Sequence, residues 1–215
     1  MIRHHPSADI LADYARGTLN QGAMLVVGCH IDGCATCRNE AGLWEIASGA
    51  MLEARQAEPL KEGALEGALS KLDAPAPARS TGTTPSFLKK YAVPDLLKRE
   101  RVGMRRWVTP NIWFAPVLSA SAASSLTYLV YARANTVLSQ HTHGGLEFTQ
   151  VVYGSFGDSE GVFGPGDFAQ TDPQILHSPT ATKDSGCLCL ISSEAPMQLT
   201  GTTARILQSL LGTLY

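Results

Sequence analysis

Apolar residues near the start of the chain recur at the spacing of an amphipathic helix. This first run lies between residues 6–9, a Pro-Ser-Ala-Asp stretch typical of a helix start, and Gly17, a residue that often ends helices. We expect two further helices, at residues 20–30 and 34–53. The pattern therefore predicts a small all-helical unit at the start of the chain.

A separate apolar stripe follows in residues 58–72. Leu65, Leu69 and Leu72 are spaced four and three residues apart, which places them on one face of a helix. Such a helix either packs on its own domain or lies in the groove of a partner protein. The spacing does not choose between the two.

Residues 73–86 consist mainly of Pro, Ala, Ser, Thr and Gly, a composition typical of a linker. We therefore divide the chain into a helical domain with its linker at residues 1–85 and a second domain at residues 86–215. The second domain is expected to begin with a short helix in residues 87–99, interrupted at Pro94.

From Arg101 onward the pattern changes to short runs of β-branched and aromatic residues separated by turn residues. Many short strands of this kind predict a β-sandwich or barrel, with a short terminal helix at residues 204–211. The fold class is thus α+β and multi-domain, a small all-α domain followed by an all-β domain. The clearest strand candidates are residues 107–108, 112–114, 126–131, 148–153 and 187–191.

Composition narrows the classes of function. The chain has 215 residues and a net charge of −2, so it lacks the basic surface that direct nucleic-acid binding requires. The sequence contains no run of about 18 apolar residues, so it predicts no membrane span, and no apolar segment near the start resembles a signal peptide. We therefore expect a cytoplasmic protein, and an odd number of cysteines, five, argues against a disulfide framework.

The first candidate metal site is the HxxxCxxC pattern formed by His30, Cys34 and Cys37. Thiolate and imidazole are the ligands that zinc favours, and Cys34 and Cys37 lie one helical turn apart. His5 is our candidate for the fourth ligand, and His4 is its rival on spacing alone. Three unrelated buried residues are the alternative, but a small helical domain often needs a metal to fold.

The second candidate site is the segment that contains His141, His143 and Glu147. On a strand these side chains point to one face, and His177 would add a third imidazole from a later strand. Three histidines and a glutamate suit zinc, iron, manganese or nickel. Hydrogen-bonded structural histidines are the alternative, although all six histidines of the chain fall within or next to the two candidate sites.

The remaining cysteines are read mainly as core residues. Cys187 and Cys189 alternate with leucines, so both point to one face of a strand. Ordinary buried positions are favoured over redox chemistry, which stays open because both thiols could face the same interior as the metal. Cys29 follows Val26 and Val27 and is expected to be structural.

The second site resembles the cupin superfamily, whose first motif is HxHxxxE followed by a glycine, here Gly154. The final histidine of the second motif is matched by His177, and the Phe-Gly-Pro-Gly-Asp sequence at residues 163–167 resembles the turn between the motifs. The segment at residues 173–177 departs from the family pattern because it lacks the glycine before the histidine.

The first site resembles the zinc-binding anti-sigma domain, and the two motifs in this order resemble the ChrR-type anti-sigma factors. This resemblance implies that the first domain binds an extracytoplasmic-function sigma factor and blocks its access to RNA polymerase. It also implies that the cupin is needed for release under oxidative stress, with singlet oxygen and organic peroxide as signals. By position, the implied ligands are His5, His30, Cys34 and Cys37 for one zinc, and His141, His143, Glu147 and His177 for a second zinc or another divalent metal.

Inhibition would then act by occlusion of the sigma factor, not by catalysis. We expect apolar residues of the three helices to face a groove or the partner, with the helix of Leu65, Leu69 and Leu72 as a further contact. The candidate contact residues on the three helices are Leu11, Tyr14, Leu43, Ile46 and Met51.

Two other interpretations, an enzyme and a DNA-binding protein, compete with this one, and a thiol switch is compatible with it. A cupin with three histidines and a glutamate also matches a metal-dependent, dioxygenase-like enzyme. Cys34 and Cys37 would form a thiol switch if zinc loss allowed a disulfide between them. Direct binding to DNA is the least favoured, and a homodimer through the cupin sheet remains open.

Overall fold

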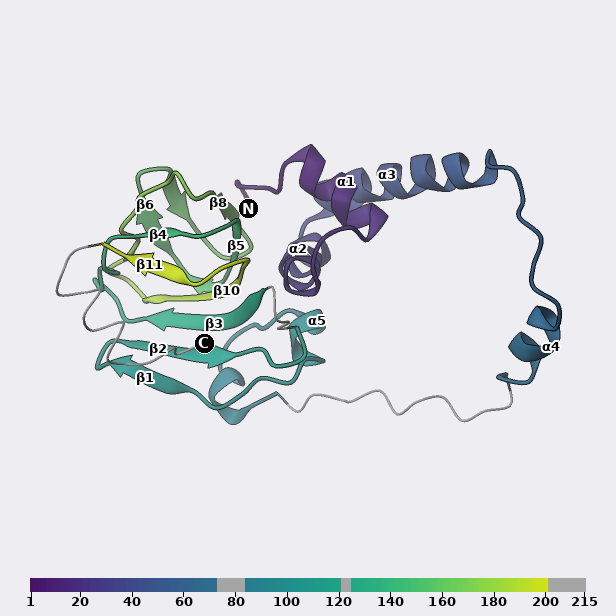
Figure 1. Cartoon of the computed structure of the whole chain (residues 1–215). Helices are drawn as coiled ribbons and strands as arrows, with labels where there is room; N and C mark the ends of the chain where they lie inside the picture. Colours follow the sequence, from purple (N-terminus) through teal and green to yellow (C-terminus); the bar gives the residue numbers. More distant parts are fainter. Residues whose placement is uncertain (73–83, 121–124, 201–215) are drawn as a thin grey trace.

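The computed structural model describes residues 1–72, 84–120 and 125–200, and Figure 1 shows three helices on one side of a β-barrel with a fourth helix set apart. The terminal helix predicted at residues 204–211 lies outside the described residues, as does most of the predicted linker. None of the helices in the described ranges is long and apolar enough to cross a lipid bilayer.

The first three helices form where the sequence pattern places them, and the starts of the first two are capped by side chains. Ser7 accepts a hydrogen bond from the backbone N–H of Ile10, and Asn20 accepts one from Ala23. Gly17 takes the left-handed conformation, with φ of 69°, that ends the first helix. The helices are α1 (Ala8–Arg16), α2 (Gln21–Gly33) and α3 (Ala35–Glu53).

Helix α2 is buried on more than one side. It contacts α1 and α3, and it also packs on strands β5 (Glu147–Gly154) and β10 (Cys187–Ser193) of the barrel. Gly22 allows this approach, because a Cβ atom there would lie 2.1 Å from Oγ1 of Thr127 and 2.5 Å from Oγ of Ser192. A helix enclosed in this way is apolar around most of its circumference, as α2 is.

The later helices are shorter than the sequence predicts. The stripe at residues 58–72 yields only α4 (Ala64–Leu69), which begins after Gly63 in a left-handed conformation with φ of 75°. The helix expected at residues 87–99 is divided around Pro94 into a 3-10 turn, η1 (Ser86–Leu88), and α5 (Asp95–Lys98), which contacts α2.

The barrel is built from antiparallel strands in three sheets. The large sheet has the order β1-β2-β3-β10-β5-β8, and the smaller ones are β11-β4 and β7-β6-β9. An isolated bridge between His141 and His177 joins the two segments that carry the cupin motifs. The remaining strands are β1 (Arg106–Thr109), β2 (Ile112–Pro116), β3 (Leu126–Ala132), β4 (His141–His143), β6 (Phe156–Asp158), β7 (Gly161–Phe163), β8 (Phe168–Thr171), β9 (Thr180–Ala181) and β11 (Met197–Leu199).

Strand alternation divides the apolar residues into two clusters. Leu188 and Leu190 of β10 point outward and share one cluster with Val26 and Val27 of α2. Cys187 and Cys189 point inward and belong to the cluster inside the barrel. The helices and the sheet share one hydrophobic cluster, so packing does not separate two domains. The domain boundary predicted between residues 85 and 86 therefore stays a prediction.

Two candidate metal centres

Four donor side chains meet at the junction of the helices. His5 lies in the segment before α1, His30 in the last turn of α2, Cys34 between α2 and α3, and Cys37 in the first turn of α3. Nδ1 of His5 lies 3.4 Å from Sγ of Cys34 and 3.3 Å from Sγ of Cys37, and Nε2 of His30 lies 3.3 Å from Sγ of Cys37. One ligand atom of each residue lies within 4.8 Å of all the others.

These distances fit a tetrahedral zinc ion. Zinc bound at about 2.3 Å to sulfur and about 2.0 Å to nitrogen separates the two donor atoms by about 3.5 Å. Burial raises the pKa of the Cys37 thiol to about 12, so a thiolate there requires a cation beside it. Burial lowers the pKa of His30, which keeps that imidazole neutral and able to bind a metal.

The structure separates the two rival histidines near the start of the chain. His5 points to the cysteines, while Nδ1 of its neighbour His4 lies 3.2 Å from Oδ2 of Asp167 in the barrel. The His4 ring also packs against Phe163, with ring centroids 4.3 Å apart. Spacing alone could not distinguish the two residues, because the difference depends on barrel residues about 160 positions away.

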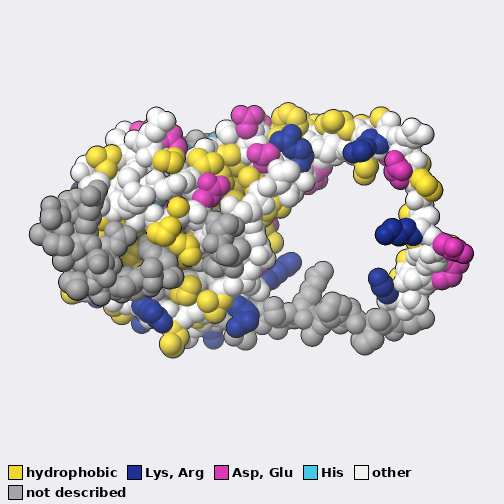
Figure 2. Space-filling model, in the orientation of Figure 1, with side chains coloured by type: hydrophobic (Ala, Val, Ile, Leu, Met, Phe, Trp, Pro, Cys, Tyr) yellow, Lys and Arg dark blue, Asp and Glu magenta, His cyan; other side chains and the backbone are white. Residues whose placement is uncertain are grey.

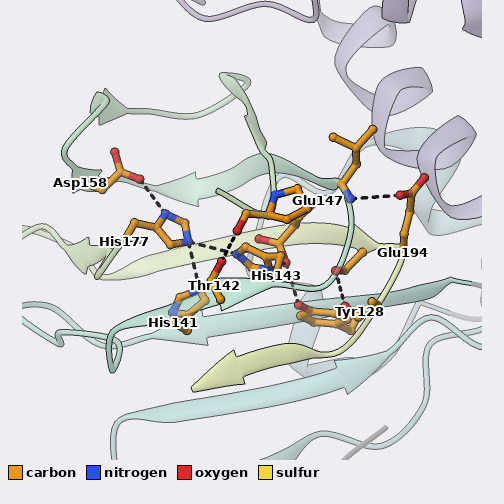
Figure 3. Close-up of polar contacts among 12 residues, drawn as sticks. Tyr128, His141, Thr142, His143, Glu147, Asp158, His177 and Glu194 are labelled. Atoms are coloured by element: carbon orange, nitrogen blue, oxygen red, sulfur yellow. Dashed lines mark hydrogen bonds and ion pairs between the residues drawn. The ribbon is translucent and has the colours of Figure 1, made fainter. Parts of the chain in front are cut away.

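A second group of donors lies inside the barrel. His141 and His143 come from β4, and His177 comes from the segment before β9 (Figure 3). Nε2 of His177 lies 3.1 Å from Nε2 of His141 and 3.2 Å from Nε2 of His143. Imidazoles on one tetrahedral zinc would place these nitrogens about 3.3 Å apart, so the arrangement fits a divalent metal.

The contacts of two Nδ1 atoms explain why the Nε2 atoms of the same rings are free to bind a metal. Nδ1 of His141 lies 2.8 Å from the carbonyl oxygen of Ser139, and Nδ1 of His177 lies 3.3 Å from a carboxylate oxygen of Asp158. A proton on Nδ1 therefore leaves the lone pair of Nε2 directed at the centre. Burial lowers the pKa of His141 and of His143 to about 4, so both are neutral near pH 7.

Glu147, the fourth predicted ligand, is buried beside the histidines but outside the group of three. One of its carboxylate oxygens lies 3.2 Å from Nδ1 of His143 and accepts a hydrogen bond of 3.3 Å from the Tyr128 hydroxyl. Burial raises the pKa of Glu147 to about 8, which a nearby cation would oppose. Glu147 thus stays a predicted metal ligand, and in this structure it contacts the outer ring nitrogen of His143.

Sequence reasoning did not single out Asp158, although it is the partner of His177. It lies at the end of β6, next to a turn, and has no distinctive spacing from the histidines. Its contact with His177 arises only when the β7-β6-β9 sheet closes over the histidine group. No sequence signal identified it in advance.

A largely apolar cavity connects the histidine group with the inward-facing cysteines. His141 and His177 line one part of it, and Cys187 and Cys189 line another. The two cysteine sulfurs lie 3.4 Å apart and are not bonded. A hydrogen bond with Cys187, together with burial, raises the pKa of Cys189. The cysteines are buried residues that share a cavity with the histidines, and a redox role for them stays a prediction.

The surface expected to meet a partner is mostly present. Leu43, Ile46 and Met51 on α3 are exposed by 68%, 71% and 74%, and Figure 2 shows hydrophobic side chains along this helix. Leu11 is fully buried in the cluster between the helices and the sheet, so the prediction that it faces a partner is wrong for the free chain. Tyr14 is half-buried, with its hydroxyl close to Gly28 of α2.

Comparisons with known proteins cover both the helices and the barrel. The model of the ChrR cupin-like domain family matches residues 101–196. The anti-sigma-E factor ChrR of Cereibacter sphaeroides is 31% identical over 212 residues, which cover 96% of this chain and 97% of that protein. The crystal structure of Rhodobacter sphaeroides SigE in complex with the anti-sigma ChrR matches with a TM-score of 0.72 and 30% identity, over 90% of this chain and 99% of that chain.

These matches settle which group of cupin proteins the chain is related to. They extend over the helices as well as the barrel. The chain belongs to the ChrR family of anti-sigma factors, a family of regulators and not of enzymes.

Proposed function

We propose that this chain binds and inhibits an extracytoplasmic-function sigma factor in the cytoplasm. The helical part, residues 1–85, makes the contact, and the cupin, residues 86–215, is required for release of the sigma factor under oxidative stress. The family to which the chain belongs, whose relative forms a complex with the sigma factor SigE, supports this partner.

The exposed apolar surface of α3 and α4 is the observation that carries the proposal. We define it by residues that are each more than half exposed: Leu43, Ile46, Met51, Leu52, Leu65 and Leu69. Four of these residues lie on α3, and exposed groups of large apolar side chains mark sites of protein–protein interaction. The second half of α3 contains no buried residue, so no packing within the described chain accounts for its apolar side chains.

A zinc ion would hold the base of this surface in place. His5, His30, Cys34 and Cys37 come from the segment before α1, from α2 and from the start of α3, so one ion would fix all three relative to one another. Such a site contributes folding free energy directly in small domains. Loss of the ion would change the angle at which α3 leaves the helical unit.

The cupin would contribute the response to stress through its own metal. His141, His143, Glu147 and His177 would hold a divalent ion, and the cysteine pair shares their cavity. Because α2 packs directly on β5 and β10, a change inside the barrel has a short physical route to the helices. Release requires only that the altered barrel favours a helical arrangement that binds the sigma factor less tightly.

A transcription assay tests the inhibition. The full chain is added to RNA polymerase and the sigma factor encoded beside this gene, and it should reduce transcription. Met51→Asp should weaken inhibition at least tenfold, because a charge at an exposed interface position removes apolar contact. Met104→Asp is the matched control, since Met104 is 79% exposed but lies on the barrel side of the chain. Equal inhibition by both variants would contradict the proposed contact surface.

A second assay addresses the cupin. The full chain with His141→Ala should still inhibit but should fail to release the sigma factor after treatment with singlet oxygen or an organic peroxide. Normal release by this variant would exclude the cupin metal as the sensor. Light scattering of the purified chain checks the remaining prediction, a homodimer through the cupin sheet.

A further inference from the structure

One turn of the barrel holds the first residues of the chain. The turn at residues 164–168 follows β7 and leads into β8. Asp167 accepts hydrogen bonds from the backbone N–H of Arg3 at 2.6 Å and of His4 at 3.1 Å. The backbone N–H of Phe168 donates to the carbonyl oxygen of His4 at 3.1 Å. Residues 3 and 4 are thereby fixed to the barrel directly before His5.

Asp167 is built for this contact. It is 2% exposed, and its second carboxylate oxygen accepts from the backbone N–H of Gly164 at 2.8 Å and lies 3.2 Å from Nδ1 of His4. Each carboxylate oxygen therefore contacts the start of the chain, 163 or 164 residues away in sequence. A buried carboxylate with several donors is costly to disturb, because any donor it loses is left without a partner.

The same turn also orients a second predicted zinc ligand. The carbonyl oxygen of Gly166 lies 2.9 Å from Nδ1 of His30, which directs Nε2 of that ring at Cys37. The ring of Phe168 meets the His30 ring edge to face, with centroids 5.9 Å apart. Two of the four predicted ligands in the helical unit are thus positioned by neighbouring residues of the barrel.

We propose that the turn at residues 164–168 forms the outer shell of the helical zinc site. Asp167 holds the segment that carries His5, and Gly166 holds His30, so the cupin sets how tightly the helical unit retains its metal. This inference rests on the proposed zinc site and assigns it a control that lies in the other part of the chain. Partners of ligands commonly change metal affinity by 10- to 100-fold.

The hairpin before the turn extends this control to the second metal centre. Asp158 on β6 lies 3.3 Å from Nδ1 of His177, while the carbonyl oxygen of Val162 on β7 accepts a hydrogen bond from the Arg3 side chain at 3.1 Å. The two strands pair directly. A displacement of His177 would therefore reach the start of the chain through one hairpin, and metal retention by the helices would respond to the state of the barrel.

Cobalt(II) titration of the full-length, metal-free chain tests the inference, because charge-transfer absorption from thiolate to cobalt reports the cysteine site and not the histidine group. The Asp167→Asn variant should require at least tenfold more cobalt for half-saturation of this band than the unaltered chain. Asp184→Asn, at an exposed position in the loop before β10, is the matched control and should titrate like the unaltered chain.

A second pair of variants leaves the barrel intact. Arg3→Pro removes the backbone N–H that donates to Asp167, whereas Arg3→Ala keeps it. Weaker cobalt binding in Arg3→Pro than in Arg3→Ala supports the inference even if Asp167→Asn fails to fold. Equal half-saturation in Arg3→Pro and Arg3→Ala would overturn it. Absence of the band in the unaltered chain would instead remove the zinc site of the proposed function.

Discussion

Gly22 offers a direct test of the contact between α2 and the barrel. A Cβ atom at this position would lie 2.1 Å from Oγ1 of Thr127 and 2.5 Å from Oγ of Ser192, both buried on the strands that α2 covers. Gly22→Ala must therefore shift the helix or these side chains. Gly49, on the exposed half of α3, has no atom within 4 Å of the same added group and provides the control.

The expected effects differ in sign. Overpacking of this kind costs about 1–3 kcal/mol. Displacement of Thr127 also threatens the 2.9 Å hydrogen bond from its hydroxyl to the carbonyl oxygen of Ala120, and loss of such a bond costs about 1–3 kcal/mol. The gain in helix propensity from alanine returns at most about 1 kcal/mol. Gly22→Ala should lower the free energy of unfolding by about 2 kcal/mol, while Gly49→Ala should leave it unchanged or raise it.

Thermal unfolding of the full chain, followed by circular dichroism, measures the difference. For a chain of this size, a loss of about 2 kcal/mol lowers Tm by roughly 4–8 °C. If Gly22→Ala unfolds at the same temperature as Gly49→Ala, α2 does not lie against β3 and β10 in solution. The helices and the sheet would then not share one hydrophobic cluster.

Three further predictions concern acid stability, metal content and thiol reactivity. Burial pushes the pKa of Asp167 upward, but its hydrogen bonds outweigh burial and hold the pKa at about 2, below the usual 3.8. This stabilisation, about 2 kcal/mol, is present above pH 4 and is lost as the pH falls toward 2. In urea titrations of metal-free protein, the free energy of unfolding of the Asp167→Asn variant should therefore fall less between about pH 4 and pH 2 than that of the unaltered chain. His141→Ala should reduce bound metal from two ions to one per chain, as measured by elemental analysis. If the variant retains two ions, the second ion does not bind at the histidine group. Cys187 and Cys189 should resist iodoacetamide in the folded chain and react after unfolding, as read by mass spectrometry, and rapid labelling of the folded chain would show that the cavity is open.

Local pattern was sufficient for most of the elements. The helical spacing and the helix start at residues 6–9 predicted α1, the helical pattern at residues 20–30 predicted α2, and the runs of β-branched residues predicted the main strands. The predicted helix at residues 58–72 is longer than α4, which begins only after Gly63 in its left-handed conformation and ends at Leu69. Periodicity records which residues are apolar and does not record what covers them.

Long-range contacts account for what the pattern missed. Leu11 was expected to face a partner because an amphipathic face looks the same whether another protein or the chain itself covers it; here the cluster between helices and barrel covers it. No motif marks Asp158, and the turn motif at residues 163–167 contains Asp167 without indicating its contact with the start of the chain. Both roles depend on residues that folding brings from 19 and 164 positions away. The side chains of the two candidate metal sites were easier to predict because the chemistry of metal ligands limits the choice to few residue types.

The exposed half of α3 has a consequence for how the protein is made. A chain without its partner displays leucine, isoleucine and methionine side chains to water, which favours self-association and attack by proteases. Surplus chains would therefore be short-lived, and any chains that persisted would aggregate. Synthesis of this chain and its partner in equal amounts would avoid these losses. The half-life of the free chain would then limit how much unbound chain accumulates.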